Sequence, residues 1–181
     1  MPDVTRFEEL FDTEELADLG PGPRPGVLSA DQLEKQLGPA LAGSGLPGQQ
    51  QDLLRALVLL WHDHLEAAHV IAQNIPTADG SFVHGIMHRR EPDFGNAAYW
   101  FRRVGSHPAF RLMPARAEPL LGRSKGTFTW TAALIRNGSW DPFAFIDACQ
   151  AAGAKPGAEQ TLLRQLQKEE FKVLLECFQK K

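Results

Sequence analysis

Cysteines are scarce in this chain, and it has neither a long apolar run nor a basic leader. Cys149 and Cys177 are the only cysteines among 181 residues, too few for a disulfide framework or a cysteine zinc site, so we expect two reduced core thiols. The apolar run that ends at Trp61 stops at His62, well short of the ~20 residues that a membrane-spanning helix needs. The acidic start argues against a secretory or transit peptide. We therefore expect a cytoplasmic protein with no membrane partner.

Charge is low overall and unevenly distributed. The formal net charge of −3 argues against a dedicated nucleic-acid binder, and an apolar content of 43% is enough to form a core. Residues 1–20 hold seven acidic side chains and one arginine, whereas residues 84–116 hold six arginines and two acidic side chains. Opposite charges predict attraction between these segments, within one chain or between copies. Two solvated faces of unlike charge are the alternative.

Glycine and proline divide the chain into three segments. Twelve of the 29 residues from Gly20 to Gly48 are Gly or Pro, a composition typical of a connector. We expect an acidic amphipathic arm at residues 1–20, a connector with one short helix at residues 21–48, and a helical core domain at residues 49–181.

The arm is expected to be docked. It carries an apolar stripe of Phe7, Leu10 and Phe11. A helix this short is marginal in water without tertiary packing, and exposed phenylalanines would promote aggregation. We expect the stripe to pack on the body of its own chain, or on a second copy in a homodimer.

Helical periodicity dominates the rest of the chain, and no strand pattern has a visible partner. The sequence predicts an all-α, single-domain bundle of about seven to nine helices with no sheet. Pro108, Pro114 and Pro119 are expected to divide their stretch into short pieces. The expected helices are Ala30–Leu37 (capped by Ser29, stopped by Gly38-Pro39), Gln49–Asn74, Ser81–Arg90 (capped by Ser81), Asn96–Val104, Phe128–Arg136, Pro142–Ala152 (capped by Asp141) and Ala158–Phe178.

Three of the six histidines fall on the expected long helix. At ~100° per residue, Glu66 and His69 share an edge stripe with His62. A carboxylate between two imidazoles suits a metal site or a general base, so His62, Asp63 and Glu66 are candidate catalytic residues. An ordinary solvent-exposed polar face is the alternative. His64 is expected to be a hydrogen-bonded core histidine.

A second histidine pair follows on the next expected helix. His84 and His88 are four residues apart, so on a helix they share one face and form a competent pair of ligands for zinc, iron, manganese or copper. The nearest third ligand is His69 or His62, because a short turn makes the two helices antiparallel neighbours. Hydrogen bonds to backbone and carboxylates are the alternative. A di-iron site is not expected, since only one Glu-x-x-His motif occurs.

Arginines near the only tyrosine indicate an anion site. Arg89 and Arg90 end one expected helix, and Arg102 and Arg103 lie on the next one, close to Tyr99. Guanidinium groups with a phenol hydroxyl suit a carboxylate or a phosphate. Internal ion pairs at a helix end are the alternative for Arg89 and Arg90.

One block of the chain resembles a known family. The motifs are Trp61-His62-Asp63, then His69 and Gln73, then His84-Gly-Ile-Met-His88-Arg-Arg-Glu-Pro-Asp-Phe, and Tyr99-Trp-Phe-Arg-Arg-Val-Gly105, with a weaker match at Trp140-Asp141-Pro142-Phe143. Over about residues 55–110 the chain resembles a family of small all-helical proteins found in bacteria and filamentous fungi. No activity is established for that family. The resemblance implies that the histidine and arginine block is the working surface, and it implies no mechanism.

Two classes of function follow from these residues. Nucleotide binding and covalent catalysis lack their motifs, since no Gly-rich loop follows a strand and no Gly-x-Ser-x-Gly occurs. The first class is a metal-dependent enzyme or metal-binding protein, with a divalent transition metal (Zn, Fe or Mn) held by His69, His84 and His88. The alternative is a metal-free binding module for an anionic small molecule or an acidic segment of a partner protein.

Overall fold

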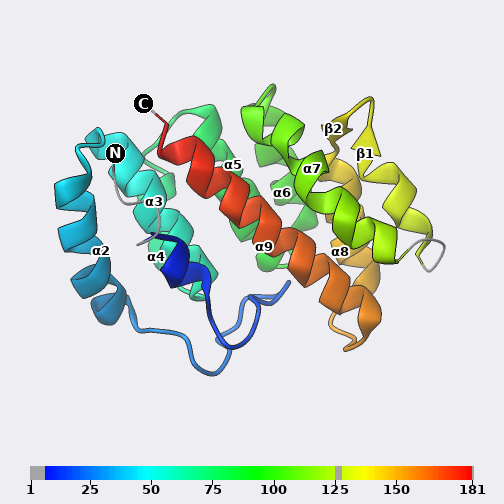
Figure 1. Cartoon of the computed structure of the whole chain (residues 1–181), viewed down its shortest axis with the longest axis horizontal. Helices are drawn as coiled ribbons and strands as arrows, with labels where there is room; N and C mark the ends of the chain where they lie inside the picture. Colours follow the sequence, from blue (N-terminus) through cyan, green and yellow to red (C-terminus); the bar gives the residue numbers. More distant parts are fainter. Residues whose placement is uncertain (1–6, 125–127, 181) are drawn as a thin grey trace.

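The computed structural model describes residues 7–124 and 128–180 of the chain (Figure 1). The all-α prediction is confirmed for these residues. None of their helices is both long and apolar enough to cross a membrane. The elements in these ranges are η1 (Glu9–Phe11), α2 (Ala30–Ser44), α3 (Gly48–Trp61), α4 (Leu65–Ala72), α5 (Ala78–Arg90), α6 (Phe94–Val104), α7 (Pro108–Arg123), η2 (Thr129–Ala133), β1 (Ile135–Arg136), β2 (Ser139–Trp140), α8 (Pro142–Ala152) and α9 (Ala158–Phe178).

The last helix forms the centre of the bundle. α9 crosses the molecule between α3 on one side and α7 on the other, and α5 and α6 form a closely packed pair behind it (Figure 1). Its leucine, valine and phenylalanine side chains are buried, as the helical period predicts. Phe171 of α9 meets Trp61 of α3 and Phe11 of the N-terminal segment in one aromatic cluster, with ring centroids 5.3–6.2 Å apart. The core therefore joins the two ends of the chain.

The expected helix Gln49–Asn74 is two helices, and this prediction was wrong. α3 ends at Trp61, and Asp63 follows in the left-handed conformation with φ +67°. The Asp63 N–H bonds to the Leu60 carbonyl and the His64 N–H to the Leu59 carbonyl, which is the Schellman arrangement of a helix end. Glycine is usual at this position, so the sequence carried no stop signal.

Two other helices are longer than expected. α2 continues through Pro39 to Ser44, and α7 is one helix with two prolines inside it. A proline inside a helix removes one hydrogen bond and strains the turn before it. In α2 the loss is offset by burial of a continuous apolar stripe, Leu33, Leu37 and Leu41, each at most 1% exposed.

Some predicted caps and helix bounds are confirmed, and others are wrong. Ser29 and Asp141 cap α2 and α8 as predicted, and α9 has the predicted bounds. Helix α5 begins at Ala78 with Thr77 as its cap, so the expected start at Ser81 was wrong. The expected helix Phe128–Arg136 is also wrong. That segment forms η2 and one strand of a two-residue antiparallel hairpin, in which Ile135 pairs with Trp140 and Arg136 with Ser139.

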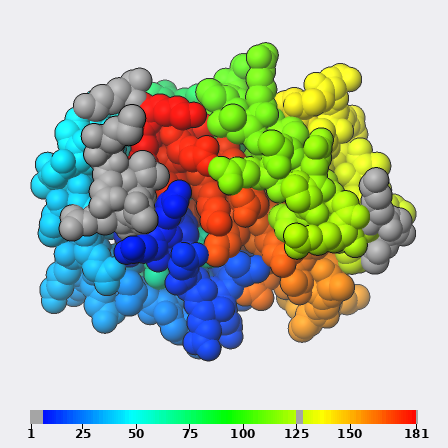
Figure 2. All heavy atoms as spheres, in the orientation of Figure 1, coloured from blue at the N-terminus to red at the C-terminus, as the bar shows by residue number. Residues whose placement is uncertain are grey.

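The N-terminal segment, residues 7–28, is docked on the body of its own chain. Phe7, Leu10 and Phe11 are at most 8% exposed, so the predicted docking is confirmed for these residues, while residues 1–6 of the expected arm lie outside the described ranges. The segment runs beside α9 on the face seen in Figure 2. Its acidic side chains Asp12 and Asp18 pair with residues of α9, and not with the arginines of residues 84–116 as expected. A homodimer through this segment stays a prediction.

Candidate functional site

His62 lies inside the core and links two parts of the N-terminal segment. Its Nδ1 accepts a hydrogen bond from the Leu28 N–H at 3.2 Å, which leaves Nε2 to donate to the Leu10 carbonyl at 2.9 Å. Burial lowers the pKa of His62, so the ring is neutral. Both nitrogens are engaged and the residue is 2% exposed. His62 therefore serves the packing of the segment, and the predicted edge stripe does not form.

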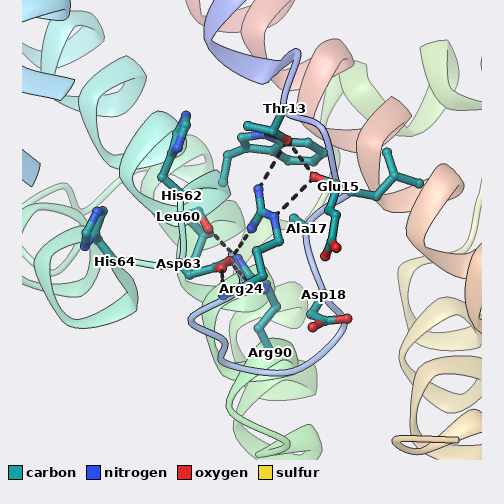
Figure 3. A network of polar contacts seen from close by, with 12 residues as sticks. Thr13, Glu15, Ala17, Asp18, Arg24, Leu60, His62, Asp63, His64 and Arg90 are labelled. Atoms are coloured by element: carbon teal, nitrogen blue, oxygen red, sulfur yellow. Dashed lines mark hydrogen bonds and ion pairs between the residues drawn. The ribbon is translucent and has the colours of Figure 1, made fainter. Parts of the chain in front are cut away.

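Asp63 is the centre of a buried ionic network (Figure 3). Its Oδ2 accepts from the Arg24 N–H at 2.8 Å, and its Oδ1 lies 2.5 Å from Nη1 of Arg24 and 2.6 Å from Nη2 of Arg90. Arg90 also donates to the carbonyls of Gly20 and Leu60. The side chains of Asp63, Arg24 and Arg90 are at most 2% exposed. This network locks the connector against α3 and α5, and sequence reasoning missed Arg24 because no local motif marks it.

Arg89 of α5 is enclosed in a second buried network, formed with α9. It donates from Nη1 and Nη2 to the Glu170 carboxylate and from Nη2 to Gln167, both on α9, and lies 4.5 Å over the Phe145 ring. The alternative of internal ion pairs therefore describes Arg89 and Arg90 in this structure. Because both guanidinium groups are buried and paired, they are not open to an external anion.

Glu66 of the predicted stripe and His64, which was expected in the core, lie apart from the Asp63 network. Glu66 is exposed on α4, and it stands away from the buried His62. His64 is half-buried, and its Nε2 lies 2.8 Å from the Leu28 carbonyl. The predicted catalytic residues are therefore not together. His62 bonds to the N-terminal segment, Asp63 lies in its ionic network, and Glu66 is on the surface.

The three histidines predicted as metal ligands do come together. His69 comes from α4, and His84 and His88 come from α5. Their ring centroids are 5.2 Å apart for His69 and His84, 5.9 Å for His69 and His88, and 6.2 Å for His84 and His88. We call these three residues the histidine cluster.

His84 holds the most distinctive atom of the cluster. Its Nδ1 lies 3.2 Å from the Gly80 carbonyl, which accepts the Nδ1 proton and leaves a lone pair on Nε2. That Nε2 is buried and has no hydrogen-bond partner among the described residues. Burial lowers the pKa of His84 to about 4, and the neighbouring His69, His88 and Arg103 act in the same direction. The imidazole is therefore neutral at pH 7, and no described residue donates a hydrogen bond to its acceptor nitrogen.

His88 has partners on both of its nitrogens. Nδ1 lies 3.2 Å from the Glu91 carboxylate, and the side-chain amide of Asn96 lies 3.2 Å from Nε2. Burial lowers the pKa of His88, against the opposing effect of Glu91 and Asp93. A carboxylate on the outer nitrogen of a histidine is the arrangement that orients metal-binding imidazoles in proteins.

Helix α6 reaches the cluster because α5 carries glycine where the two helices touch. A Cβ atom at Gly85 would lie 2.6 Å from the Phe101 ring, so any other residue would force the helices apart. The close approach stacks Trp100 on His84 with a centroid distance of 4.0 Å and an angle of 9° between the rings. Sequence reasoning missed this contact, for which Gly85 was the available signal.

Three predicted anion ligands are exposed on α6 at the edge of the cluster. The Arg103 guanidinium lies 5.3 Å over Trp100 and 5.8 Å from the Tyr99 ring, and donates to the Tyr99 hydroxyl at 3.4 Å. Arg102 is exposed and forms no ion pair within residues 7–124 and 128–180. Tyr99, Arg102 and Arg103 therefore form an exposed rim beside Trp100.

The cluster has the spacing of a metal site without its ligand geometry. With Zn–N bonds of ~2.0–2.1 Å and tetrahedral angles, imidazole centroids stand roughly 5 Å apart, close to the separations in the cluster. Even so, no three His, Cys, Asp or Glu side chains of the described ranges have their ligand atoms arranged to hold an ion. His69, His84 and His88 would therefore have to rotate to bind one metal. No protein family, curated protein or solved structure was found to match this chain.

A cavity of the described residues lies away from the histidine cluster. It measures about 720 Å³ and lies between the connector at Gly20, the residue Phe94 of α6 and the turn after α8. Cys149 lines it, and burial raises the pKa of that thiol to about 12, so it is unreactive, as expected for a core cysteine. Arg164 at its edge is engaged by the carbonyls of Leu16 and Ala17. The cavity therefore offers no reactive thiol, and two nitrogens of its arginine are already engaged.

Proposed function

We propose that the protein binds a divalent transition metal through His69, His84 and His88. The observation that carries the proposal is the buried Nε2 of His84, which has a free lone pair and no partner among the described residues. A buried acceptor without a partner costs about 1–3 kcal/mol, and a metal bound there would remove that cost.

The chemistry of the three side chains favours zinc. All three donors are imidazole nitrogens, which suit zinc and iron, whereas manganese prefers oxygen ligands. The Gly80 carbonyl and the Glu91 carboxylate supply the outer-nitrogen contacts that orient His84 and His88. At His88 the metal would take the place of the Asn96 amide on Nε2.

Three protein ligands leave one tetrahedral position for water or a substrate. Structural zinc sites have four protein ligands, whereas catalytic sites have three and keep one position open. The donor set therefore favours a working site over a structural one, and the reaction is not specified by it.

The test is metal binding by the purified full-length protein after removal of metals. We expect one equivalent of Co²⁺ or Zn²⁺ to bind, and His69→Ala to weaken binding by at least about tenfold. His69 is half-buried on α4, so the variant should stay folded, which far-UV circular dichroism checks. His64→Ala is the matched control, because His64 is equally half-buried in the neighbouring turn and outside the cluster. Equal affinities of the wild type and His69→Ala would contradict the proposal.

A metal-free anion-binding module is the second proposal, supported by the exposed rim of Tyr99, Arg102 and Arg103. It predicts that the metal-stripped protein gains thermal stability from phosphate or acetate. The first proposal predicts a gain of thermal stability from Co²⁺ or Zn²⁺ instead.

A further inference from the structure

The cavity of about 720 Å³ beside the connector has the size and the walls of a small-molecule site. Small-molecule sites measure roughly 300–1,000 Å³ and are lined mostly by apolar groups with a few polar ones. Leu19 and Phe94 line this cavity together with Pro21, Pro92 and Pro156. The three prolines are exposed, so the cavity opens to solvent.

Only two of the described residues that line the cavity are charged, and their charges are opposite. Nε of Arg164 on α9 lies 3.6 Å from Oδ1 of Asp18, which is longer than a hydrogen bond. Among the described residues, the Asp18 carboxylate accepts no hydrogen bond, and it stands apart from the Asp63 network in Figure 3. Nη1 of Arg164 donates none, since only its Nε and Nη2 are engaged. Both charged groups therefore keep hydrogen-bonding capacity for a ligand.

Contacts between α9 and the N-terminal segment fix both groups in place. Arg164 donates from Nε to the Ala17 carbonyl at 3.3 Å and from Nη2 to the Leu16 carbonyl. The buried Gln167, also on α9, donates to the main-chain carbonyl of Asp18 at 2.9 Å. Groups that are already fixed lose less conformational entropy when a ligand binds.

A pair of opposite charges selects against ions of a single sign. An anion that is attracted to Arg164 is repelled by Asp18, and a cation meets the reverse, whereas a molecule with both charges satisfies each group. In an α-amino acid the ammonium nitrogen and the carboxylate carbon are ~2.5 Å apart by standard bond lengths. Both of its charged groups can therefore reach two side chains that lie 3.6 Å from each other.

We propose that this cavity binds a small zwitterion, an α-amino acid with an apolar side chain. Its carboxylate accepts from Nη1 of Arg164, its ammonium group donates to the Asp18 carboxylate, and its side chain packs against the apolar wall that includes Phe94. The inference goes beyond the proposed metal site and does not depend on it, because none of the described residues that line the cavity belongs to the histidine cluster.

The test is a titration of the full-length protein with L-phenylalanine, with a chelator present and with protein NMR signals as the readout. Three related compounds each lack one feature: N-acetyl-L-phenylalanine lacks the ammonium charge, L-phenylalaninamide lacks the carboxylate charge, and glycine lacks the apolar side chain. We expect L-phenylalanine to bind with an apparent Kd in the millimolar range or below. Each of the other three should bind at least about tenfold more weakly, the usual size of a lost charge-assisted contact or of a lost buried side chain.

Two aspartates of the N-terminal segment provide matched variants. Asp18→Asn should raise the Kd of L-phenylalanine about tenfold. It should also bind N-acetyl-L-phenylalanine more tightly than the wild type does, because the repulsion between two carboxylates is gone. Asp12→Asn breaks an exposed pair with Lys168 of α9 outside the cavity, and it should change the Kd less than about twofold. Both aspartate side chains are partly exposed, so both variants should stay folded, which far-UV circular dichroism checks.

Three results would overturn the inference, whatever the metal titration shows. The first is the absence of any shift with L-phenylalanine up to tens of millimolar. The second is binding of either blocked form as tight as that of L-phenylalanine, because one charge or none would then suffice. The third is equal weakening by Asp18→Asn and Asp12→Asn, which would mean that general charge attraction, and not this cavity, explains the binding.

Discussion

Single residues in this protein depend on partners far away in the sequence. Asp63 is held by Arg24 and Arg90, which are 39 and 27 residues distant, and it ends α3 in a left-handed conformation. Buried charges are tolerated only when they are paired, so the two arginines and the carboxylate depend on one another. The fold at this point is set by charge pairing more than by apolar packing.

Asp63→Asn should destabilise the protein strongly. Asparagine tolerates the left-handed conformation, so the change removes the charge without straining the backbone. Two buried guanidinium groups would then lack their carboxylate, and the free energy of unfolding should fall by about 3 kcal/mol. Asp52→Asn, which breaks an exposed pair with Arg55, should cost below about 1 kcal/mol. Urea unfolding measures both, and equal losses would contradict the interpretation.

His84 should make the metal-free protein sensitive to acid. Its pKa is about 4 in the folded chain and ~6.5 in the unfolded chain, so between these values the unfolded chain binds a proton that the folded chain does not. The contribution of His84 to stability is therefore full above pH ~6.5 and is lost as the pH falls towards 4, a loss on the order of 2–3 kcal/mol. The lowered pKa of His62 acts in the same direction.

The matched variant for this prediction is His84→Phe, which keeps a ring against Trp100 and cannot titrate. Unfolding by urea at pH 7 and pH 5, with a chelator present, measures the difference. The loss of stability between the two pH values should be smaller in His84→Phe than in the wild type. An identical loss in both proteins would mean that other groups cause the acid sensitivity.

Five of the helices, α2, α5, α6, α7 and α8, begin at a side chain that caps them. Thr77 begins α5 by accepting a hydrogen bond from the Gly80 N–H at 3.3 Å. This turn includes the Gly80 carbonyl that orients His84, so the start of the helix also sets the geometry of the cluster. In α7 two internal prolines do not end the helix, because burial of its apolar face keeps the helix continuous.

Thr77→Ala should lower the free energy of unfolding by about 1 kcal/mol, because the N-terminal turn of α5 loses its side-chain acceptor. Thr77→Ser keeps a hydroxyl at the same place and should restore most of that loss. Thermal or urea unfolding of both variants measures the effect. If serine were no better than alanine, the cap would not be the cause.

The N-terminal segment completes the core of the molecule. Phe11 packs against Trp61 and Phe171, and the carbonyls of Leu10 and Ala17 accept hydrogen bonds from His62 and Gln167. The segment therefore completes the core and satisfies buried polar groups at once. Its ion pairs at the surface contribute little by comparison.

Phe11→Ala should cost about 3–5 kcal/mol, the usual cost of removing a buried phenylalanine side chain. Glu14→Ala, an exposed change in the same segment, should change stability by less than about 0.5 kcal/mol. Deleting residues 1–20 should lower the melting temperature at least as much as Phe11→Ala. A truncated protein with an unchanged melting temperature would show that the core does not need this segment.

Features that depend on neighbouring residues could be predicted from the amino-acid sequence. Helical class, the caps at Ser29 and Asp141, and the bounds of Ala158–Phe178 follow from local hydrogen bonds and apolar periodicity. The meeting of His84 and His88 belongs here as well, because their spacing of four residues places both rings on one helix face.

Features that depend on partners distant in the sequence are visible only in the tertiary structure. Asp63 breaks the helix that local periodicity would continue, because Arg24 and Arg90 bind its carboxylate. Arg89 is turned inward by Glu170, 81 residues away, although its local sequence suits a surface anion site. Trp100 stacks on His84 because Gly85 lets two helices approach closely. The physical reason is the same in each case: a buried charge or a close helix contact outweighs a local preference of about 1 kcal/mol, and its partner is not visible in the neighbouring sequence.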